Sequence, residues 1–456
     1  MIFFRRVIAV LALAALLLPT AALWQAAAAQ SREKISLIRD AEIENAIRAY
    51  ARPLFEAAGL ENDAVSVHIV NDPAINAFVA GGQRLFLFTG LMMRAATAGQ
   101  VRGVIAHETG HIAGGHLARL QEQLENATIE NILEMLLTAA AIAGSTAAGA
   151  QTGTSRGGGP PVGVAQRGLF SYTRAQEQAA DQAAVTLLDR IGQSSQGLAD
   201  FTAMLMQQEL VAGLRPDPYL RTHPLTQERV AFLRQHVETS RFSKVPVPAQ
   251  LETMHERVVA KLYGFIDPAQ ALRKYPPSDN SVAGRYARSI AYYRSGNLPE
   301  AVGLIDGLIR QMPNDPYFHE LRGQMLFENQ RIAESIVSYE RAVALLPQSG
   351  LLKIALAHAL LQNPTPAQSQ RAQKLLETVE QRERDSGYWR QMSMIYDQTG
   401  NIGMRALALA ELAYARGDRV DALRHATAAE QNLKFGTPAY QRAQDIRFLA
   451  ERPRRN

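Results

Sequence analysis

Cysteine is missing altogether from this chain of 456 residues. Structural disulfides and lipid attachment through a cysteine are therefore excluded, so stability must come from packing or from a bound metal. An excess of one charge is also missing, because 48 lysines and arginines against 43 aspartates and glutamates leave a formal net charge of only +5. No dense basic run occurs outside residues 452–455, so the sequence gives no case for a nucleic-acid partner.

Long apolar runs are scarce too, apart from the one at the N-terminus. Residues 1–6 include two arginines, residues 7–23 are apolar, and four alanines follow at 26–29. This order is typical of a signal peptide, so we expect residues 1–29 to be cleaved off and the protein to be periplasmic. An uncleaved anchor helix is the alternative, but Pro19 and the alanine-rich end argue against it.

A second apolar stretch, residues 132–150, is interrupted by Glu134, Gly144 and Gly149. It is too short and too rich in small residues to predict a membrane span. We expect a helix that lies against its domain or makes at most peripheral contact with a membrane. Glycine-rich residues 153–168 predict a flexible loop, and the sequence leaves open whether segment 132–168 touches a membrane or acts as a lid.

Between these two stretches the chain mixes helix and strand patterns. Residues 41–58 carry apolar side chains at helical spacing, and residues 65–69 alternate as in a half-buried strand. Two β-rich runs on either side of Gly81 and Gly82 suit a hairpin, and the pattern is helical from Leu91 onward. We therefore expect a mainly helical domain with a small β-sheet over residues 30–265.

Beyond about residue 262 the pattern becomes helical and repetitive. Residues 285–313 and 319–347 match at a period of 34 residues, and each fits a helix–turn–helix unit. Looser copies follow, about four in all, which predicts an α-solenoid of tetratricopeptide-like repeats over residues 266–456. A generic helical domain is the alternative, and the constant offset favours repeats. The expected fold class is thus α+β followed by an α-solenoid.

The chemistry is concentrated in the run His107-Glu108-Thr109-Gly110-His111. Residues four apart share one face of a helix, so His107 and His111 can direct ring nitrogens at one metal ion. Zinc lowers the pKa of a bound water to about 7 and polarises a scissile carbonyl. Glu108 can then accept the proton of that water and pass it to the leaving amine. Two histidines on an ordinary helix are the alternative interpretation.

Two histidines leave a catalytic zinc short of a third protein ligand. In the helical stretch TRAQEQAAD, Glu177 and Asp181 are four residues apart and share a face. We expect Glu177 to be the third ligand, and Asp181 to accept the spare N–H of a ligand histidine and hold its tautomer. His116 lies about 100° round the helix from the ligand face, so we expect it to be structural or to support a ligand.

Together, HETGHIAGGH, TRAQEQAAD and THPLTQER resemble the HtpX- and prenyl-protease-type gluzincin family, in its soluble, repeat-bearing periplasmic branch. The resemblance covers nearly the whole mature chain. It implies a zinc metallopeptidase with one Zn²⁺ per chain, in which His107, His111 and Glu177 bind the metal and Glu108 is the base.

The resemblance also carries over to two segments away from the helices. His223-Pro224 is similar to a downstream motif of the family, and Arg229 follows at the expected offset. Our hypothesis is that His223 approaches the metal, either as a fourth ligand that silences the resting enzyme or as an oxyanion stabiliser. A family edge strand that could hold an extended substrate by β-augmentation, or else an ordinary core strand, is expected at Asn76, Ala77 and Phe78.

The function that this resemblance implies is an exported endopeptidase for misfolded or misassembled envelope proteins, in the quality control of outer-membrane β-barrel assembly. The repeats would dock the client or the assembly machinery. A periplasmic chaperone or scaffold with a latent zinc site is the alternative from another class. A membrane-embedded protease is disfavoured because several long apolar spans are lacking.

Overall fold

The computed structural model describes residues 36–61, 64–80, 83–116, 132, 172–212, 219, 222–362 and 364–451. The expected signal peptide, the Gly81-Gly82 turn and almost all of segment 132–168 lie outside the described residues. Leu37–Asn456 forms one compact unit. Among the described helices, none is long and apolar enough to cross a membrane.

The predicted small sheet is present and has four strands: β1 (Ser36–Ile38), β2 (Ser66–Asn71), β3 (Ala77–Ala80) and β4 (Arg84–Phe88). Their order in the sheet is β1-β2-β4-β3. Strands β3 and β4 pair antiparallel, as the predicted hairpin requires, whereas β2 and β4 run parallel. Every residue of β3 is buried, although the strand lies at one end of the sheet, so other elements must cover its free edge.

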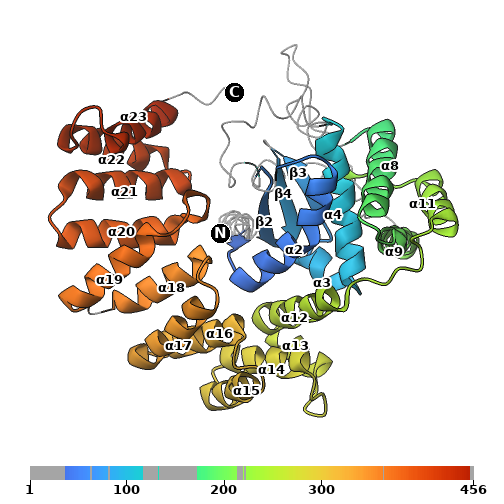
Figure 1. Ribbon diagram of the computed structural model, residues 1–456, viewed down its shortest axis with the longest axis horizontal. Coiled ribbons are helices and arrows are strands. Elements are labelled where there is room, and N and C mark those ends of the chain that lie inside the picture. Colours follow the sequence, from blue (N-terminus) through green and yellow to red (C-terminus); the bar gives the residue numbers. More distant parts are fainter. Residues whose placement is uncertain are drawn as a thin grey trace, which may run out of the picture. The chain divides into compact units, whose positions relative to one another are not determined.

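Among the described residues, five helices join α4 (Ala98–Ala113) in the N-terminal region, as Figure 1 shows. They are α2 (Ala41–Ala57), α3 (Thr89–Arg94), α8 (Arg174–Arg190), α9 (Gln196–Ala212) and α11 (Gln227–Thr239). The Thr97 side chain caps α4 by accepting the Gln100 N–H, and Thr173 and Gln176 form a capping box at the start of α8. Residues 100–111 of α4 are all buried, because α2, α8, α9 and β3 each pack against this helix.

Glycines allow α4 to approach its neighbours closely. A Cβ added at Gly110 would lie 2.8 Å from the Ala180 carbonyl oxygen of α8, and one at Gly103 would lie 2.7 Å from the Leu198 backbone of α9. Real Cβ atoms do not come so close to backbone atoms, so any side chain at either position must push the helices apart. The separation of α4 and α8 therefore depends on Gly110.

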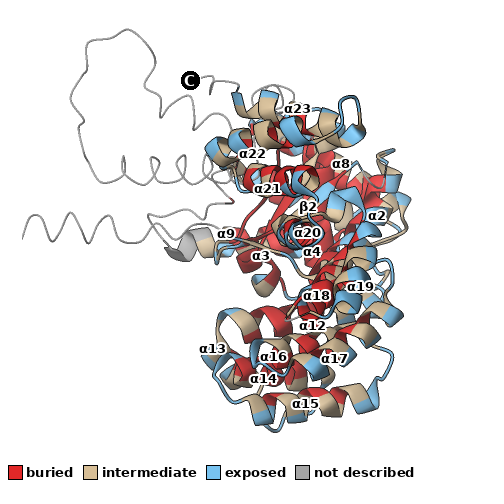
Figure 2. Ribbon diagram, turned by 90° about the vertical axis from the view of Figure 1, so that its left-hand side faces the viewer, coloured by how far each residue is buried: buried red, intermediate tan, exposed pale blue. Residues whose placement is uncertain are grey.

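Two helices, α12 (Ala249–Ile266) and α13 (Pro268–Lys274), lead into five helix pairs. Helix α14 begins at Val282, and α16 and α18 each begin 34 residues after the previous first helix, which matches the predicted period. Figure 2 shows the buried faces of these pairs. The pairs are α14 (Val282–Arg294) with α15 (Leu298–Gln311), α16 (Pro316–Glu328) with α17 (Ile332–Leu345), α18 (Gly350–Leu360) with α19 (Pro366–Glu377), α20 (Ser386–Gln398) with α21 (Ile402–Ala415), and α22 (Arg419–Asn432) with α23 (Pro438–Glu451).

The described residues thus hold five pairs, where the sequence pattern predicted about four. The later pairs pack through small side chains, among them Ala410, Ala422 and Ala426, all of them fully buried. Alanine fits the close approach of two helices but carries little hydrophobic signal, so the pattern of these copies is faint in the sequence. The expected fold class is confirmed, while the boundary at residues 265 and 266, in the last turn of α12, stays a prediction.

A buried cluster of charges joins α2 to α12 and the first repeats. Lys261 of α12 is 1% exposed, and its Nζ lies 2.6 Å from Asp40 Oδ2. Arg257 Nη2 lies 2.6 Å from Glu42 Oε1, and the Tyr286 hydroxyl donates to Glu42 Oε2 at 2.8 Å. Because buried charges are costly when they lose a partner, this cluster holds α2 in place against the repeats.

The first prediction concerns Gly110. Gly110→Ala should destabilise the protein by roughly 1–3 kcal/mol and lower its metal content, because the new methyl group must push α8 away from α4. Urea unfolding followed by far-UV circular dichroism, with metal analysis of the same samples, measures both effects. Gly303→Ala is the matched control: a Cβ at this exposed position in α15 meets nothing within 4 Å and should stabilise the helix by up to about 1 kcal/mol. Equal stability of the two variants would contradict the close approach.

Candidate metallopeptidase site

Three elements bring the predicted site residues together. Helix α4 carries His107, Glu108 and His111, helix α8 carries Glu177, and His223 lies just before α11. All five side chains are fully buried. His107, His111, Glu177 and His223 each offer a ligand atom, and these four atoms lie within 4.8 Å of one another.

The donor atoms are spaced as a small metal ion needs. His107 Nε2 and His111 Nε2 lie 3.1 Å apart, His111 Nε2 lies 3.2 Å from Glu177 Oε1, and His107 Nε2 lies 3.6 Å from Glu177 Oε2. Bonds of about 2.1 Å to a tetrahedral zinc would place ligand atoms about 3.4 Å apart. The triangle formed by His107, His111 and Glu177 therefore fits a tetrahedral ion with one position left over.

Asp181 and Arg229 hold two of these ligand residues, His107 and Glu177, in position. His107 Nδ1 lies 2.8 Å from Asp181 Oδ1, which places the N–H at Nδ1 and leaves the Nε2 lone pair for the cluster. Arg229 donates from Nε to Asp181 Oδ2 at 2.6 Å, and its Nη1 lies 2.5 Å from Glu177 Oε2. One guanidinium thus fixes the carboxylates of Glu177 and Asp181. No role for Arg229 follows from the sequence alone, since its pairing depends on how α11 packs on α8.

His223 reaches the centre of the site. Its Nδ1 lies 3.1 Å from Glu177 Oε1, and its Nε2 lies 3.4 Å from Glu108 Oε1 and 3.2 Å from the Ala77 carbonyl oxygen. The ring is stacked on Tyr219, with centroids 4.5 Å apart. The hypothesis that His223 approaches the ligand cluster therefore has geometric support.

The charges of the site favour a cation. Burial raises the pKa of Glu108, and among the described residues neither of its carboxylate oxygens accepts a hydrogen bond. Burial also raises the pKa of Glu177, but the neighbouring histidines outweigh it and hold this pKa well below the usual range. Burial lowers the pKa of His107, yet hydrogen bonds with Asp181 and Glu177 raise it to about 10. The donor set and the buried acceptor atoms together fit a divalent metal.

The predicted edge strand borders this site. The Phe88 N–H donates to the Asn76 carbonyl, so the backbone groups of Asn76 and of every second residue after it form the hydrogen bonds to β4. The backbone groups of Ala77 and Val79 then face away from β4, toward the site. The Ala77 carbonyl lies next to His223, whereas Phe78 stacks on Phe86 inside the sheet.

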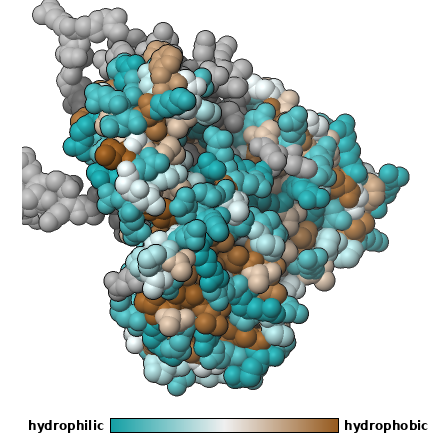
Figure 3. All heavy atoms as spheres, turned by 60° about the vertical axis from the view of Figure 1, so that its left-hand side comes forward, coloured by the Kyte–Doolittle hydropathy of each residue, from teal (hydrophilic) through white to brown (hydrophobic). Residues whose placement is uncertain are grey.

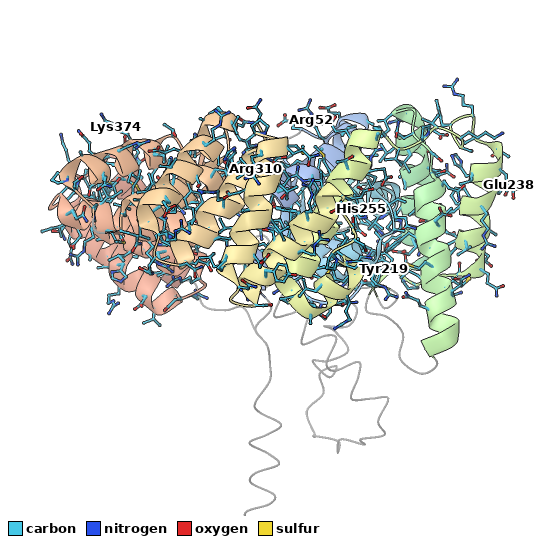
Figure 4. The ribbon with its side chains drawn as sticks, turned by 90° about the horizontal axis from the view of Figure 1, so that it is seen from below. Arg52, Tyr219, Glu238, His255, Arg310 and Lys374 are labelled. Carbon is cyan, nitrogen blue, oxygen red and sulfur yellow. The ribbon has the colours of Figure 1, made fainter. Side chains whose placement is uncertain are left out.

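Three aromatic side chains of the site, Tyr172, Tyr219 and His116, have no definite role that the sequence alone predicts. Tyr172 lies flat on His111, with centroids 3.6 Å apart, and Tyr219 stacks on His223 as described. His116 Nδ1 lies 3.0 Å from His111 Nδ1, in the supporting position expected for it. Figure 4 labels Tyr219 and His255, both buried, whereas the labelled Arg52 and Glu238 lie at the surface. Both tyrosines lie close to motif residues in sequence, Tyr172 before the α8 cap and Tyr219 before His223, which was the available signal.

Comparison with known proteins gives a consistent picture. Residues 38–237 match the family model described as Peptidase family M48. The beta-barrel assembly-enhancing protease of Yersinia pestis is 25% identical over 347 residues, which cover 74% of this chain and 69% of that protein. The Escherichia coli K12 protein of the same name is 25% identical over 431 residues, covering 90% of this chain and 83% of its own length. The mitochondrial metalloendopeptidase OMA1 of Saccharomyces cerevisiae is 33% identical over 91 residues, covering 20% and 26%.

The second prediction tests the support behind His107. Asp181→Asn should weaken zinc binding about 10- to 100-fold, because the amide cannot hold the His107 tautomer and leaves Arg229 short of a negative partner. Competition with a chromogenic chelator measures the affinity. Asp189→Asn is the matched control on the same helix, since Asp189 Oδ2 lies 3.2 Å from His236 Nε2, which is not in the ligand cluster. Unchanged zinc affinity in Asp181→Asn would show that this carboxylate has no part in metal binding.

Proposed function

We propose that the region over residues 38–237, which matches the family model described as Peptidase family M48, acts as a zinc-dependent endopeptidase on misfolded or misassembled envelope proteins. The observation that carries the proposal is the triangle of His107, His111 and Glu177 beside the buried carboxylate of Glu108, which accepts no hydrogen bond from the described residues. One zinc ion per chain fits this cluster. The periplasm is the proposed location, on the strength of the signal-peptide pattern in residues 1–29.

Each residue has a distinct task in the proposed reaction. Zinc held by His107, His111 and Glu177 would lower the pKa of a water molecule and polarise the scissile carbonyl. Glu108 would accept a proton from the attacking water and pass it to the leaving amine. Burial raises the pKa of Glu108, which makes this carboxyl a better proton acceptor than an exposed one. Asp181 and Arg229 keep His107 and Glu177 in position throughout.

The free edge of β3 is the proposed binding site for the substrate backbone. The groups of Ala77 and Val79 that face away from β4 can form a ladder with an extended segment, which would run past Glu108 and the ligand cluster. The relatives named beta-barrel assembly-enhancing protease suggest that the clients are outer-membrane β-barrel proteins, whose unpaired strands suit such an edge.

The repeats are the proposed docking surface for the client or for the outer-membrane assembly machinery. Several large hydrophobic side chains of this region are exposed, including Val337 at 64%, Ile402 at 63% and Val420 at 78%. Figure 3 shows hydrophobic groups between hydrophilic ones on one face of the molecule. The same exposed groups favour the second candidate function, a repeat-based periplasmic chaperone with a latent zinc site.

The third prediction separates the two candidates. Glu108→Gln should keep its zinc and lose cleavage of an unfolded protein by about 10²-fold or more, because the amide cannot accept the proton. Glu177→Ala should lose both zinc and cleavage, since it removes a ligand. Metal analysis and cleavage of unfolded casein measure the two properties, and wild type should hold close to one zinc per chain. If Glu108→Gln retained all activity in cells, the chaperone function would replace the proposed one.

The fourth prediction concerns His223. We propose that it occupies the remaining position of the ligand cluster and so keeps the resting enzyme silent. His223→Ala should then raise cleavage by about threefold or more, because a larger fraction of molecules has an open water site. His236→Ala, a half-buried histidine of α11 outside the cluster, should leave cleavage unchanged. An unchanged rate in His223→Ala would refute the silencing role, and a lower kcat with full zinc would indicate an oxyanion stabiliser instead.

A further inference from the structure

Both outward carbonyls of β3 are already occupied by side chains of the site. The pairing of Asn76 with Phe88 makes Ala77 and Val79 the two residues whose carbonyls face away from β4. His223 Nε2 lies 3.2 Å from the Ala77 carbonyl oxygen, and the Tyr172 hydroxyl donates to the Val79 carbonyl oxygen at 3.4 Å. A substrate strand that joins β3 must use these same carbonyls, so it competes with both side chains.

Tyr172 is tied to three parts of the site at once. Its hydroxyl contacts β3, its ring lies on His111 with an interplanar angle of 22°, and its N–H donates to the Thr222 carbonyl at 3.1 Å. The residue is 9% exposed. The ring thus lies on a proposed metal ligand, and the backbone is tied to the segment that carries His223. Together these contacts hold the hydroxyl toward the end of β3.

The hydrogen bond to Val79 is long for an O–H···O contact and is therefore weak. Among the described residues, no other group donates to the buried Val79 carbonyl, so this bond satisfies it. The bond also covers a strand edge that could pair with another chain. A backbone N–H at the usual distance of about 2.9 Å would make a better bond to the same oxygen. A hydroxyl in this position can thus be displaced by an incoming strand.

We propose that Tyr172 caps Val79 and is a specificity-determining residue for the substrate backbone. Displacing the cap requires an extended segment with a free N–H opposite Val79, so strands whose N–H groups are already paired are excluded, and so is proline at that position. The enzyme would then select unpaired β-segments by their backbone. This inference rests on the proposed function, in which the substrate joins β3.

The fifth prediction tests the cap by binding rather than by cleavage. In full-length protein carrying Glu108→Gln and loaded with zinc, Tyr172→Phe should tighten binding of a fluorescein-labelled, proline-free extended peptide about two- to fivefold. Phenylalanine keeps the ring on His111 and removes only the competing hydroxyl. Tyr50→Phe is the matched control, because the buried Tyr50 hydroxyl also donates to a backbone carbonyl, that of Leu251, at 3.4 Å but lies in α2. Fluorescence anisotropy gives the Kd values.

Replacing one peptide amide at a time by an ester locates the competing N–H. At one position the ester should abolish the gain in affinity that Tyr172→Phe produces. The proteins with and without this substitution should then bind that peptide equally. This scan on the protein that keeps Tyr172 also stands alone if the variant does not fold, since one amide must then matter more than its neighbours on the same side of the peptide. Equal Kd values for all peptides, weaker binding by Tyr172→Phe, or no peptide binding at all would overturn the cap.

The proposed function is tested separately from the cap. If wild type cleaves unfolded protein and Glu108→Gln does not, the peptidase function stands whatever the Kd values show. If cleavage does not depend on Glu108, the peptidase function fails, while the anisotropy data still report whether a strand displaces Tyr172. Zinc content of the Tyr172→Phe protein should equal that of wild type, because the stacking on His111 is retained.

Discussion

Charge balance in a buried site is the constraint on which the rest of this structure depends. Glu108, Glu177 and Asp181 are fully buried, and Arg229 is the only permanent cation that pairs with them among the described residues. Three buried carboxylates face one guanidinium and the His107 imidazole, whose pKa is raised to about 10. A deficit of positive charge remains, which isolated buried groups cannot tolerate. A divalent ion held by the imidazoles removes the deficit. The helices around the site are therefore held together by the same charges that make it reactive.

The parts of the site that lie on single helices could be predicted from the sequence. His107 and His111, like Glu177 and Asp181, are four residues apart, and a helix places such pairs on one face whatever surrounds it. The roles of Tyr172 and Arg229 could not be predicted, because their partners come from other elements and depend on packing. The edge position of β3 needed the strand order, which alternating residues do not determine.

In the repeats, too, structure set by neighbouring residues could be predicted, whereas packing between distant elements could not. The 34-residue offset predicted the first helix pairs because each repeat packs mainly against its neighbour. The alanine-rich later pairs gave a weaker pattern, although Ala410, Ala422 and Ala426 are fully buried. Helix α12 belongs to neither pattern, since it packs against α2 and α4 on one side and α14 on the other. A boundary drawn from sequence character alone therefore falls within a shared element.

The charge cluster at α2 has a consequence for the order in which the protein folds. Ribosomes deliver a chain from its N-terminus, so Asp40 and Glu42 emerge well before Lys261 and Arg257. The hydrogen bond from the Asn45 amide to the Tyr317 hydroxyl forms later still, because Tyr317 lies 272 residues further along the chain. Contacts that close such long loops form late and slowly. Helix α2, the first of the described helices, thus reaches its final place only after the first repeats have been synthesised.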